Sequence, residues 1–170
     1  MIFYSSDDIL SSVAEKMYNR NIDAVYGDVH YVRATNLQKC VRYFSSRSFR
    51  RWKMRMGFIP AHPSFYCRRI IYEKYGSFDE SFEIAGDFEN LLRLIFVYRI
   101  KIQYLPLDFV TMRIGGVSSS GLKSYKQGFK EHLRAYRKNG VYSNVLLESV
   151  RYICRIFDLM IQRLKQLFDK

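Results

Sequence analysis

Short strand-like segments alternate with amphipathic helical segments along the chain, and this alternation limits the fold more than any other feature of the sequence. Runs rich in β-branched and aromatic residues are separated by segments whose apolar residues recur every three or four positions. Such alternation is typical of α/β proteins, in which helices cover the faces of a sheet. The 170 residues suffice for one domain with a sizeable core.

Periodicity, capping residues and turn residues predict the individual elements. In the first half we expect a strand at 2–4, a helix capped by Asp7 or Asp8 and ending near Asn19, and a strand at 22–32. A loop at 33–57 with or without one short helix, a strand at 64–67 and a helix ended by Gly76 should follow. In the second half we expect a loop at 76–86, a helix from Asp87 to about Arg99, a strand pair or one bent strand at 101–116 broken at Pro106, and helices at about 121–138 and 144–168.

The chain is basic, and its charges are unevenly distributed. Its 28 Lys and Arg residues against 16 Asp and Glu residues give a net charge of +12. Ten basic residues and no acid lie between Val29 and Tyr72, whereas acids gather at Asp7 and Asp8 and again at 73–89. The basic excess favours anionic partners such as phosphates, nucleic acid or an anionic membrane. The acidic segments are candidates for a metal site or a proton acceptor.

The cysteines and the hydropathy pattern indicate a compartment. Cys40, Cys67 and Cys154 are far apart and show no pairing or metal-binding spacing, which is typical of a reducing environment. No secretory signal opens the sequence, and no uncharged run reaches the roughly 18 residues of a membrane span. We therefore expect a cytoplasmic protein.

Two pairs of acidic residues stand where chemistry is possible. Asp7 and Asp8 follow a short strand. The carboxyl end of a strand is where α/β sheets bind ligands. Carboxylates at that place suit Mg²⁺ or Mn²⁺. Asp87 and Glu89 open a helix in IAGDFENLLRL. Either pair would equally serve to start a helix, through capping and the helix dipole. His62, a lone loop histidine, is likewise a structural residue or a site residue.

Four segments, in this order and at these distances, carry a resemblance to a known family: SSDD, VYGDV, IPAHPSFYCRRIIYEKYGSFDESFEIAGDFENLLRL and MRIGGVS. They look like the second half of a family 2 glycosyltransferase of the GT-A fold, most similar to the bacterial branch that builds capsule, O-antigen and exopolysaccharide chains. The resemblance covers about residues 1–140, and its most specific part is 59–94. It implies a partial GT-A sheet with flanking helices at 1–120, followed by a basic helical extension at 121–170.

The resemblance also implies roles for individual residues. The family's Asp-x-Asp metal motif falls on Ser5-Ser6-Asp7, so Asp7, with Asp8 beside it, would hold Mn²⁺ or Mg²⁺ against the diphosphate. Ser5 departs from the first acid of that motif. The family's catalytic base falls on Asp87. The residues expected to bind substrate are His62, Glu89, Arg93, Arg113, Gly115 and Gly116.

The implied reaction is an inverting sugar transfer in cell-surface glycan synthesis. Asp87 would take the proton of an acceptor hydroxyl as that oxygen attacks the anomeric carbon of a nucleotide-sugar. The metal would stabilise the departing nucleoside diphosphate. The acceptor would be a saccharide or a lipid-linked saccharide.

One departure from the family affects activity. Family members carry further strands ahead of the metal motif, and those strands hold the nucleotide base, whereas this sequence starts at the motif. We therefore expect the chain alone to be inactive, either as a fragment of a longer enzyme or as a truncated gene product. Segments 2–4 and 23–29 would then have unpaired strand edges.

The last predicted helix has two interpretations. Its apolar residues recur at spacings of three and four, and they are Leu146, Val150, Ile153, Phe157, Met160, Leu164 and Phe168. The basic residues Arg151, Arg155, Arg163 and Lys165 surround them. The helix would either pack against the rest of the chain or lie on the anionic inner face of the plasma membrane, where lipid-linked acceptors would be reached.

A nucleic-acid-binding module is the alternative from another class. The stretch VRYFSSRSFRRWKMR combines basic and aromatic residues that could contact phosphates and stack on bases. The sequence shows no RNP, KH or zinc signature. A nucleic-acid surface would also have no need for acids clustered at Asp7, Asp8 and Asp87, so we expect no nucleic-acid partner.

Overall fold

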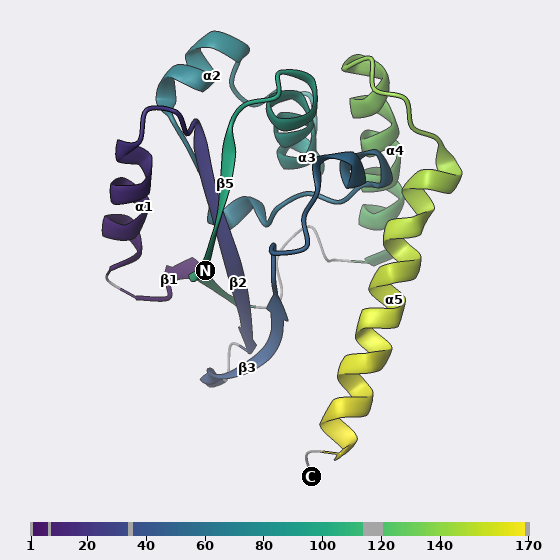
Figure 1. Cartoon of the computed structure of the whole chain (residues 1–170). Helices are drawn as coiled ribbons and strands as arrows, with labels where there is room; N and C mark the ends of the chain where they lie inside the picture. The colour runs from purple at the N-terminus through teal and green to yellow at the C-terminus, as the bar shows by residue number, and fades with distance from the viewer. Residues whose placement is uncertain (1, 7, 34–35, 114–120, 169–170) are drawn as a thin grey trace.

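The computed structural model describes residues 2–6, 8–33, 36–113 and 121–168. These residues form an α/β structure in which helices lie on both faces of a mixed five-stranded sheet (Figure 1). The α/β prediction is therefore confirmed. That the sheet is part of a GT-A fold stays a prediction.

The sheet is built around two long central strands. Its strands are β1 (Ile2–Tyr4), β2 (Ala24–Arg33), β3 (Asn36–Phe44), β4 (Phe65–Cys67) and β5 (Ile102–Arg113). They lie in the order β1-β5-β2-β3, with β4 also paired to β2. The β2–β5 pair is parallel and the other pairs are antiparallel. Because β5 lies on one edge of β2 and β3 and β4 lie on the other, the expectation of an unpaired edge at 23–29 was wrong.

The helices agree with most of the predicted ones. They are α1 (Ile9–Tyr18), the 3₁₀-helices η1 (Arg51–Met56) and η2 (His62–Ser64), α2 (Arg69–Tyr75), α3 (Gly86–Leu91), its π-helical continuation η3 (Leu92–Val97), α4 (Gly121–Lys138) and α5 (Val145–Phe168). Gly76 ends α2 with a positive φ of 88°, as the sequence predicted. The prediction for 33–57 was wrong in part, because this segment contains β3 as well as a short helix.

Alternate side chains of β2 enter two separate cores. Val25 and Val29 are buried together with α1 on one face of the sheet. Ala24 and Tyr26 are buried with side chains of α2, α3 and α4 on the other face. This alternation is the period of two that a strand covered on both faces requires. It follows that α1 and α3 pack on opposite faces of the sheet.

Segment 102–113 is one strand, so the alternative of a strand pair was wrong. Its pairing with β2 shifts register opposite Gly27, where Pro106 lies in β5. A Cβ on Gly27 would lie only 2.7 Å from the carbonyl oxygen of Leu107, so a larger residue would push this part of β5 away. The irregularity accommodates a proline inside a paired strand, because the missing N–H is tolerated at a bulge.

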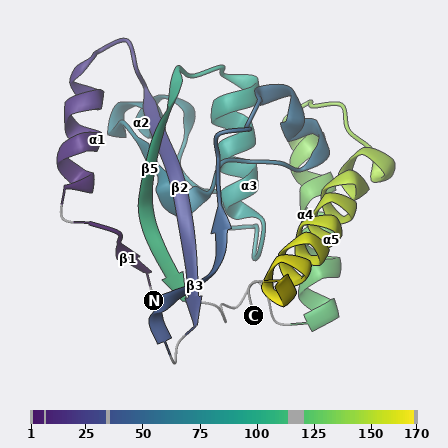
Figure 2. The ribbon, with the colours of Figure 1, turned by 60° about the horizontal axis from the view of Figure 1, so that its bottom comes forward.

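The last two helices complete one side of the molecule. Ala135 and Tyr136 of α4 are buried in the same core as α3. The first turns of α5 contact η1 and α4, and Figures 1 and 2 show α5 passing beside α4 and continuing beyond its end. The helical extension predicted at 121–170 is therefore in contact with the α/β part through α4.

Candidate functional site

Asp87 is the second residue of α3, and its side chain is half-buried. Its Oδ1 accepts a hydrogen bond of 2.7 Å from the backbone N–H of Phe88. This contact satisfies one of the N–H groups that a helix leaves without partners at its first turn. The ion pairs between described side chains all involve acids other than Asp87. The carboxylate is therefore held by a backbone contact and lies outside the ion pairs that the structure describes.

The loop that leads to Asp87 is held by a buried carboxylate of α4. Glu131 accepts hydrogen bonds from the backbone N–H groups of residues 83–85, at 2.8–3.3 Å, and from the amide of Gln127 at 2.8 Å. Burial alone would raise the pKa of Glu131, but these four donors together lower it below its usual value of 4.5. Glu131 is thus an anion that orients the backbone in front of α3.

His132, the next residue of α4, lies against the other side of this turn. Its ring stacks on that of Phe88, with the centroids 3.7 Å apart. Its Nδ1 lies 3.0 Å from Oε1 of Glu148, and its Nε2 lies 3.2 Å from Nη1 of Arg151. Burial lowers the pKa of His132 below 6.5, although the charges of Glu148 and Asp87 oppose this shift. A neutral imidazole therefore packs behind the residues at the start of α3.

Glu148 joins three elements behind this histidine. It is fully buried in α5, and its Oε1 lies 3.0 Å from the guanidinium of Arg151. The hydroxyl of Tyr136 lies 2.8 Å from Oε2 of Glu148 and 2.8 Å from the carbonyl oxygen of Met54 in η1. Burial raises the pKa of Tyr136, and the neighbouring carboxylate raises it further. Tyr136 is thus a neutral donor that links α4 to α5 and η1.

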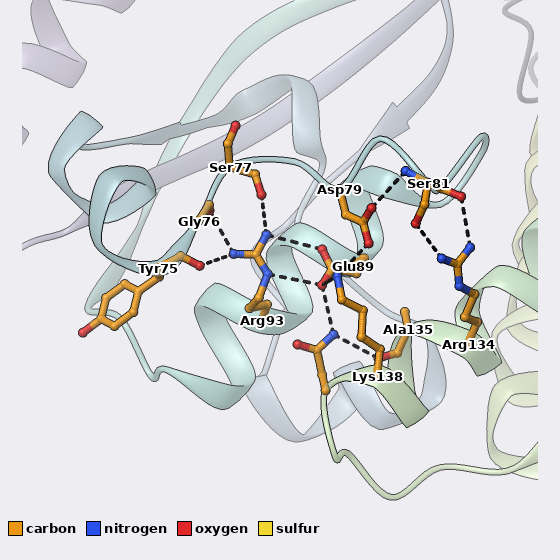
Figure 3. Close-up of polar contacts among 11 residues, drawn as sticks. Tyr75, Gly76, Ser77, Asp79, Ser81, Glu89, Arg93, Arg134, Ala135 and Lys138 are labelled. Atoms are coloured by element: carbon orange, nitrogen blue, oxygen red, sulfur yellow. Dashed lines mark hydrogen bonds and ion pairs between the residues drawn. The ribbon is translucent and has the colours of Figure 1, made fainter.

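Glu89, one turn after Asp87, lies in a second polar cluster (Figure 3). It is fully buried, and its Oε1 lies 3.2 Å from Nε of Arg93, 3.2 Å from Nζ of Lys138 and 3.1 Å from Nδ2 of Asn139. Burial alone would raise the pKa of Glu89, but hydrogen bonds from Arg93, Asn139 and Lys138 lower it below its usual value. The cluster therefore fixes α3 to α4.

Arg93 extends the same cluster toward α2. Its guanidinium donates hydrogen bonds to the carbonyl oxygens of Tyr75, Gly76, at 2.9 Å, and Ser77, at 2.6 Å (Figure 3). These carbonyls lie where α2 ends, so Arg93 replaces partners that the end of a helix leaves missing. The polar atoms of Glu89 and Arg93 have partners within the chain, and a role for either residue in substrate binding stays a prediction.

The remaining predicted site residues lie on other elements. His62 is half-buried in η2, and its ring meets that of Phe78 edge-on at 5.5 Å, in the loop that precedes α3. Arg113 is the last residue of β5, opposite Val32. Asp8 is exposed at the capping position of α1, but its side chain makes no capping hydrogen bond. Asp7, Gly115 and Gly116 lie outside the described residues.

The structure brings together some of these residues and not others. Asp87, Glu89 and Arg93 share one helical segment, and His62 contacts the loop before it. Asp8 begins α1, which packs on the face of the sheet opposite to α3. Within the described ranges, which leave out Asp7, no group of three His, Cys, Asp or Glu side chains could hold a metal ion.

A third polar cluster lies inside the sheet and was not predicted. Asp28 of β2 is buried and accepts hydrogen bonds from the hydroxyls of Tyr43, at 2.5 Å, and Tyr104, at 2.7 Å. Asp108 lies opposite it on β5, with one carboxylate oxygen 2.6 Å from Nδ1 of His30. Burial raises the pKa of Asp108. The signal in the sequence was an acid that interrupts the apolar alternation in VYGDVHYV.

The start of α3 holds a half-buried carboxylate in a fixed place. No protein-family model and no curated protein matches the chain. Roles for its residues therefore rest on the motif resemblance and on geometry. Of the acids that the structure describes, Asp87 best combines partial exposure, a fixed backbone and a carboxylate outside any ion pair.

Proposed function

We propose that the chain is the acceptor-side part of an inverting, nucleotide-sugar-dependent glycosyltransferase of cell-surface glycan synthesis. The observation that carries this proposal is the setting of Asp87. Its carboxylate is half-buried, held by the N–H of Phe88 and preceded by a loop that Glu131 fixes. A carboxylate so placed is suited to act as a general base toward a hydroxyl group.

The chain's own part in the reaction is to position Asp87 and to receive a proton there. Oδ1 is engaged by the N–H of Phe88, and no hydrogen bond to Oδ2 is present among the described residues. Oδ2 would therefore accept the proton of the acceptor hydroxyl as the oxygen forms its bond to the anomeric carbon and the bond to the diphosphate breaks. General bases contribute about 10²–10⁴-fold to the rate. Misplacing the base by about 1 Å can cost about 100-fold, so the contacts of Glu131 matter as well.

The metal that the family resemblance implies fits the residues near the first helix. Asp8 is exposed and its carboxylate makes no capping hydrogen bond, so its oxygens, which Mg²⁺ and Mn²⁺ prefer, face solvent at the start of α1. Asp7 and Asp8 would hold the ion, which would stabilise negative charge on the diphosphate.

Nucleotide binding tests this proposal. The chain should bind a nucleoside diphosphate more tightly with Mn²⁺ than without it. Asp7→Ala or Asp8→Ala should reduce that difference at least about tenfold, because these carboxylates would hold the ion whose charge attracts the phosphates. Equilibrium dialysis with labelled UDP and GDP measures the effect. Affinity that depends on Mn²⁺ and survives both substitutions would remove these residues from the site. Salt-sensitive binding of labelled RNA without any effect of nucleotide-sugars would favour a nucleic-acid-binding module instead.

A further inference from the structure

The outward side of α5 is apolar over most of its described length. The exposed apolar residues lie three, four or seven positions apart, so they form one stripe along the helix. The stripe, named here the α5 stripe, consists of Leu146 (80% exposed), Ile153 (53%), Ile156 (58%), Phe157 (60%), Met160 (55%) and Ile161 (50%). At 1.5 Å per residue it is about 22 Å long. Single exposed apolar residues are common, but a continuous stripe of this length marks an interaction surface.

The side of α5 that faces the protein carries charges. Glu148 is fully buried and Arg151 is bound to both Glu148 and His132. One turn further, the guanidinium of Arg155 lies 5.6 Å from the centre of the Tyr125 ring of α4. A surface helix of a globular protein ordinarily turns its apolar stripe to the core and its charges to water. Here the arrangement is reversed.

The reversed orientation is fixed by these contacts. Rotating α5 to bury the α5 stripe against α4 would take Glu148 away from Tyr136 and His132 of α4. The buried Tyr136 hydroxyl and His132 ring would then lose this carboxylate, and a lost partner of a buried polar group costs about 1–3 kcal/mol. The stripe is therefore held outward, where it is available to a partner.

The charge around the α5 stripe indicates an anionic partner. Residues 121–170 contain eleven basic residues and four acids, and two of these acids, Glu131 and Glu148, are buried. The exposed basic residues of α4 include Lys123, Lys126, Lys130, Arg134 and Arg137. A second copy of the chain would bring two bodies of +12 charge together, and their repulsion disfavours a dimer through this face. An anionic lipid surface offers both hydrocarbon for the stripe and phosphates for the basic residues.

The helix would lie on such a surface rather than cross it. No helix within the described part of the chain is long and apolar enough to span a membrane. Arg151 and Arg155 interrupt α5 on the side opposite the stripe. The exposed Trp52 belongs to η1, which packs against α5, and tryptophan favours the boundary between headgroups and hydrocarbon.

We propose that α5 binds the surface of an anionic lipid bilayer, with the α5 stripe inserted among the headgroups and the exposed basic residues of α4 contacting lipid phosphates. This inference does not depend on the proposed transferase activity, although it would place the chain at the surface where a lipid-linked acceptor is found. Its test uses no nucleotide-sugar, so either proposal can fail alone.

Co-sedimentation of the full chain with vesicles tests the proposal. The chain should bind vesicles of equal parts phosphatidylglycerol and phosphatidylcholine at least about tenfold more tightly than vesicles of phosphatidylcholine alone, and added salt should weaken the binding. Trp52 is the only tryptophan, so its fluorescence gives a second readout. Equal binding to neutral vesicles, or no binding to anionic ones, would overturn the proposal.

The matched variant removes the apolar stripe and leaves the charges. Ile153→Gln/Phe157→Gln/Met160→Gln should weaken binding to anionic vesicles at least about tenfold, because each side chain loses its transfer into the apolar region. Phe157→Gln alone should weaken it in the same direction and keeps the test valid if the triple variant unfolds. Ile70→Gln, at a 63% exposed residue of α2, is the control and should change nothing.

Three further outcomes are decisive. If the stripe variants bind vesicles like the unchanged chain, the stripe is not the lipid contact. If Ile70→Gln weakens binding equally, the effect is not specific to α5. If the unchanged chain ignores vesicles and sediments as a dimer that the stripe variants dissociate, the face joins two copies, and the lipid proposal is wrong.

Discussion

Oε2 of Glu131 accepts a hydrogen bond of 2.8 Å from the backbone N–H of Ala85, the residue that immediately precedes α3. The two residues lie 46 positions apart in the sequence, so this contact makes α4 the support of the turn that carries Asp87. The position of the proposed base thus depends on α4, a helix far from the turn in the sequence.

The first prediction concerns this support. Glu131→Ala should lower the free energy of unfolding by about 2–4 kcal/mol, because it leaves three backbone N–H groups near α3 without their charged acceptor. Urea denaturation measures the loss. Glu80→Ala, at an exposed acid of the same loop, is the control and should change the stability by less than about 0.5 kcal/mol. Equal losses in the two variants would show that Glu131 does not support the turn.

The second prediction concerns Arg93. Arg93→Ala should cost about 3–5 kcal/mol, because it leaves the buried Glu89 short of a cation and the carbonyls at the end of α2 without a donor. The control is Arg69→Ala, which removes an exposed ion pair with Glu73 and should cost less than about 1 kcal/mol. If Arg93→Ala proves as mild as its control while abolishing substrate binding, Arg93 belongs to the substrate site instead.

The third prediction separates steric contact from backbone strain. Gly57 and Gly140 both have a positive φ, of 80° and 63°. A Cβ on Gly57 would lie 2.7 Å from the buried carboxylate of Glu148. A Cβ on Gly140 would meet no atom within 4 Å. Gly140→Ala should cost about 1 kcal/mol, from strain alone. Gly57→Ala should cost at least about 2 kcal/mol, because η1 must also move away from α5. Equal melting temperatures for the two variants would contradict the close approach of η1 and α5.

The sequence predicted those parts of the fold whose signals are local. The apolar spacing within α1, α4 and α5 and the Gly76 that ends α2 each lie inside the element that they define. Strand β3 was not predicted, because its pairing with β2 shifts register twice and so interrupts the alternation by which a strand is recognised.

The candidate site was predictable only in part, for a related reason. Asp87 stands in a recognisable motif, so its place at the start of a helix could be predicted. Glu131, His132 and Glu148 could not be assigned in the same way, because each acts on residues brought near only by the packing of α4 and α5. The sequence showed α5 to be amphipathic, but its spacing alone did not tell which side faces water. That side is decided by the buried contacts of Glu148.

The fourth prediction concerns acid. Because the pKa of His132 is lowered in the folded chain, unfolding takes up a proton, and stability should fall as the pH drops below about 6.5. Glu89 and Glu131 also have lowered pKa values, so their stabilising contributions are present above about pH 4.5 and are lost as the pH falls below it. Urea denaturation at a series of pH values should show both stages. In His132→Gln the upper stage should disappear and the lower one remain; an unchanged upper stage would assign it to another group.

The central claim, that Asp87 is a proton acceptor and not a structural residue, is tested most directly by Asp87→Asn. Asparagine keeps the shape and the hydrogen bond to the N–H of Phe88 but cannot take the proton. The measurement is transfer of labelled sugar from nucleotide-sugars to saccharide and lipid-linked acceptors, by this chain and by a longer form with nucleotide-binding strands ahead of Ile2. In the longer form, turnover should fall at least about 100-fold, while stability and nucleotide-sugar affinity stay within a few-fold. Turnover close to that of the unchanged protein would contradict the claim and make Glu89 the next residue to test.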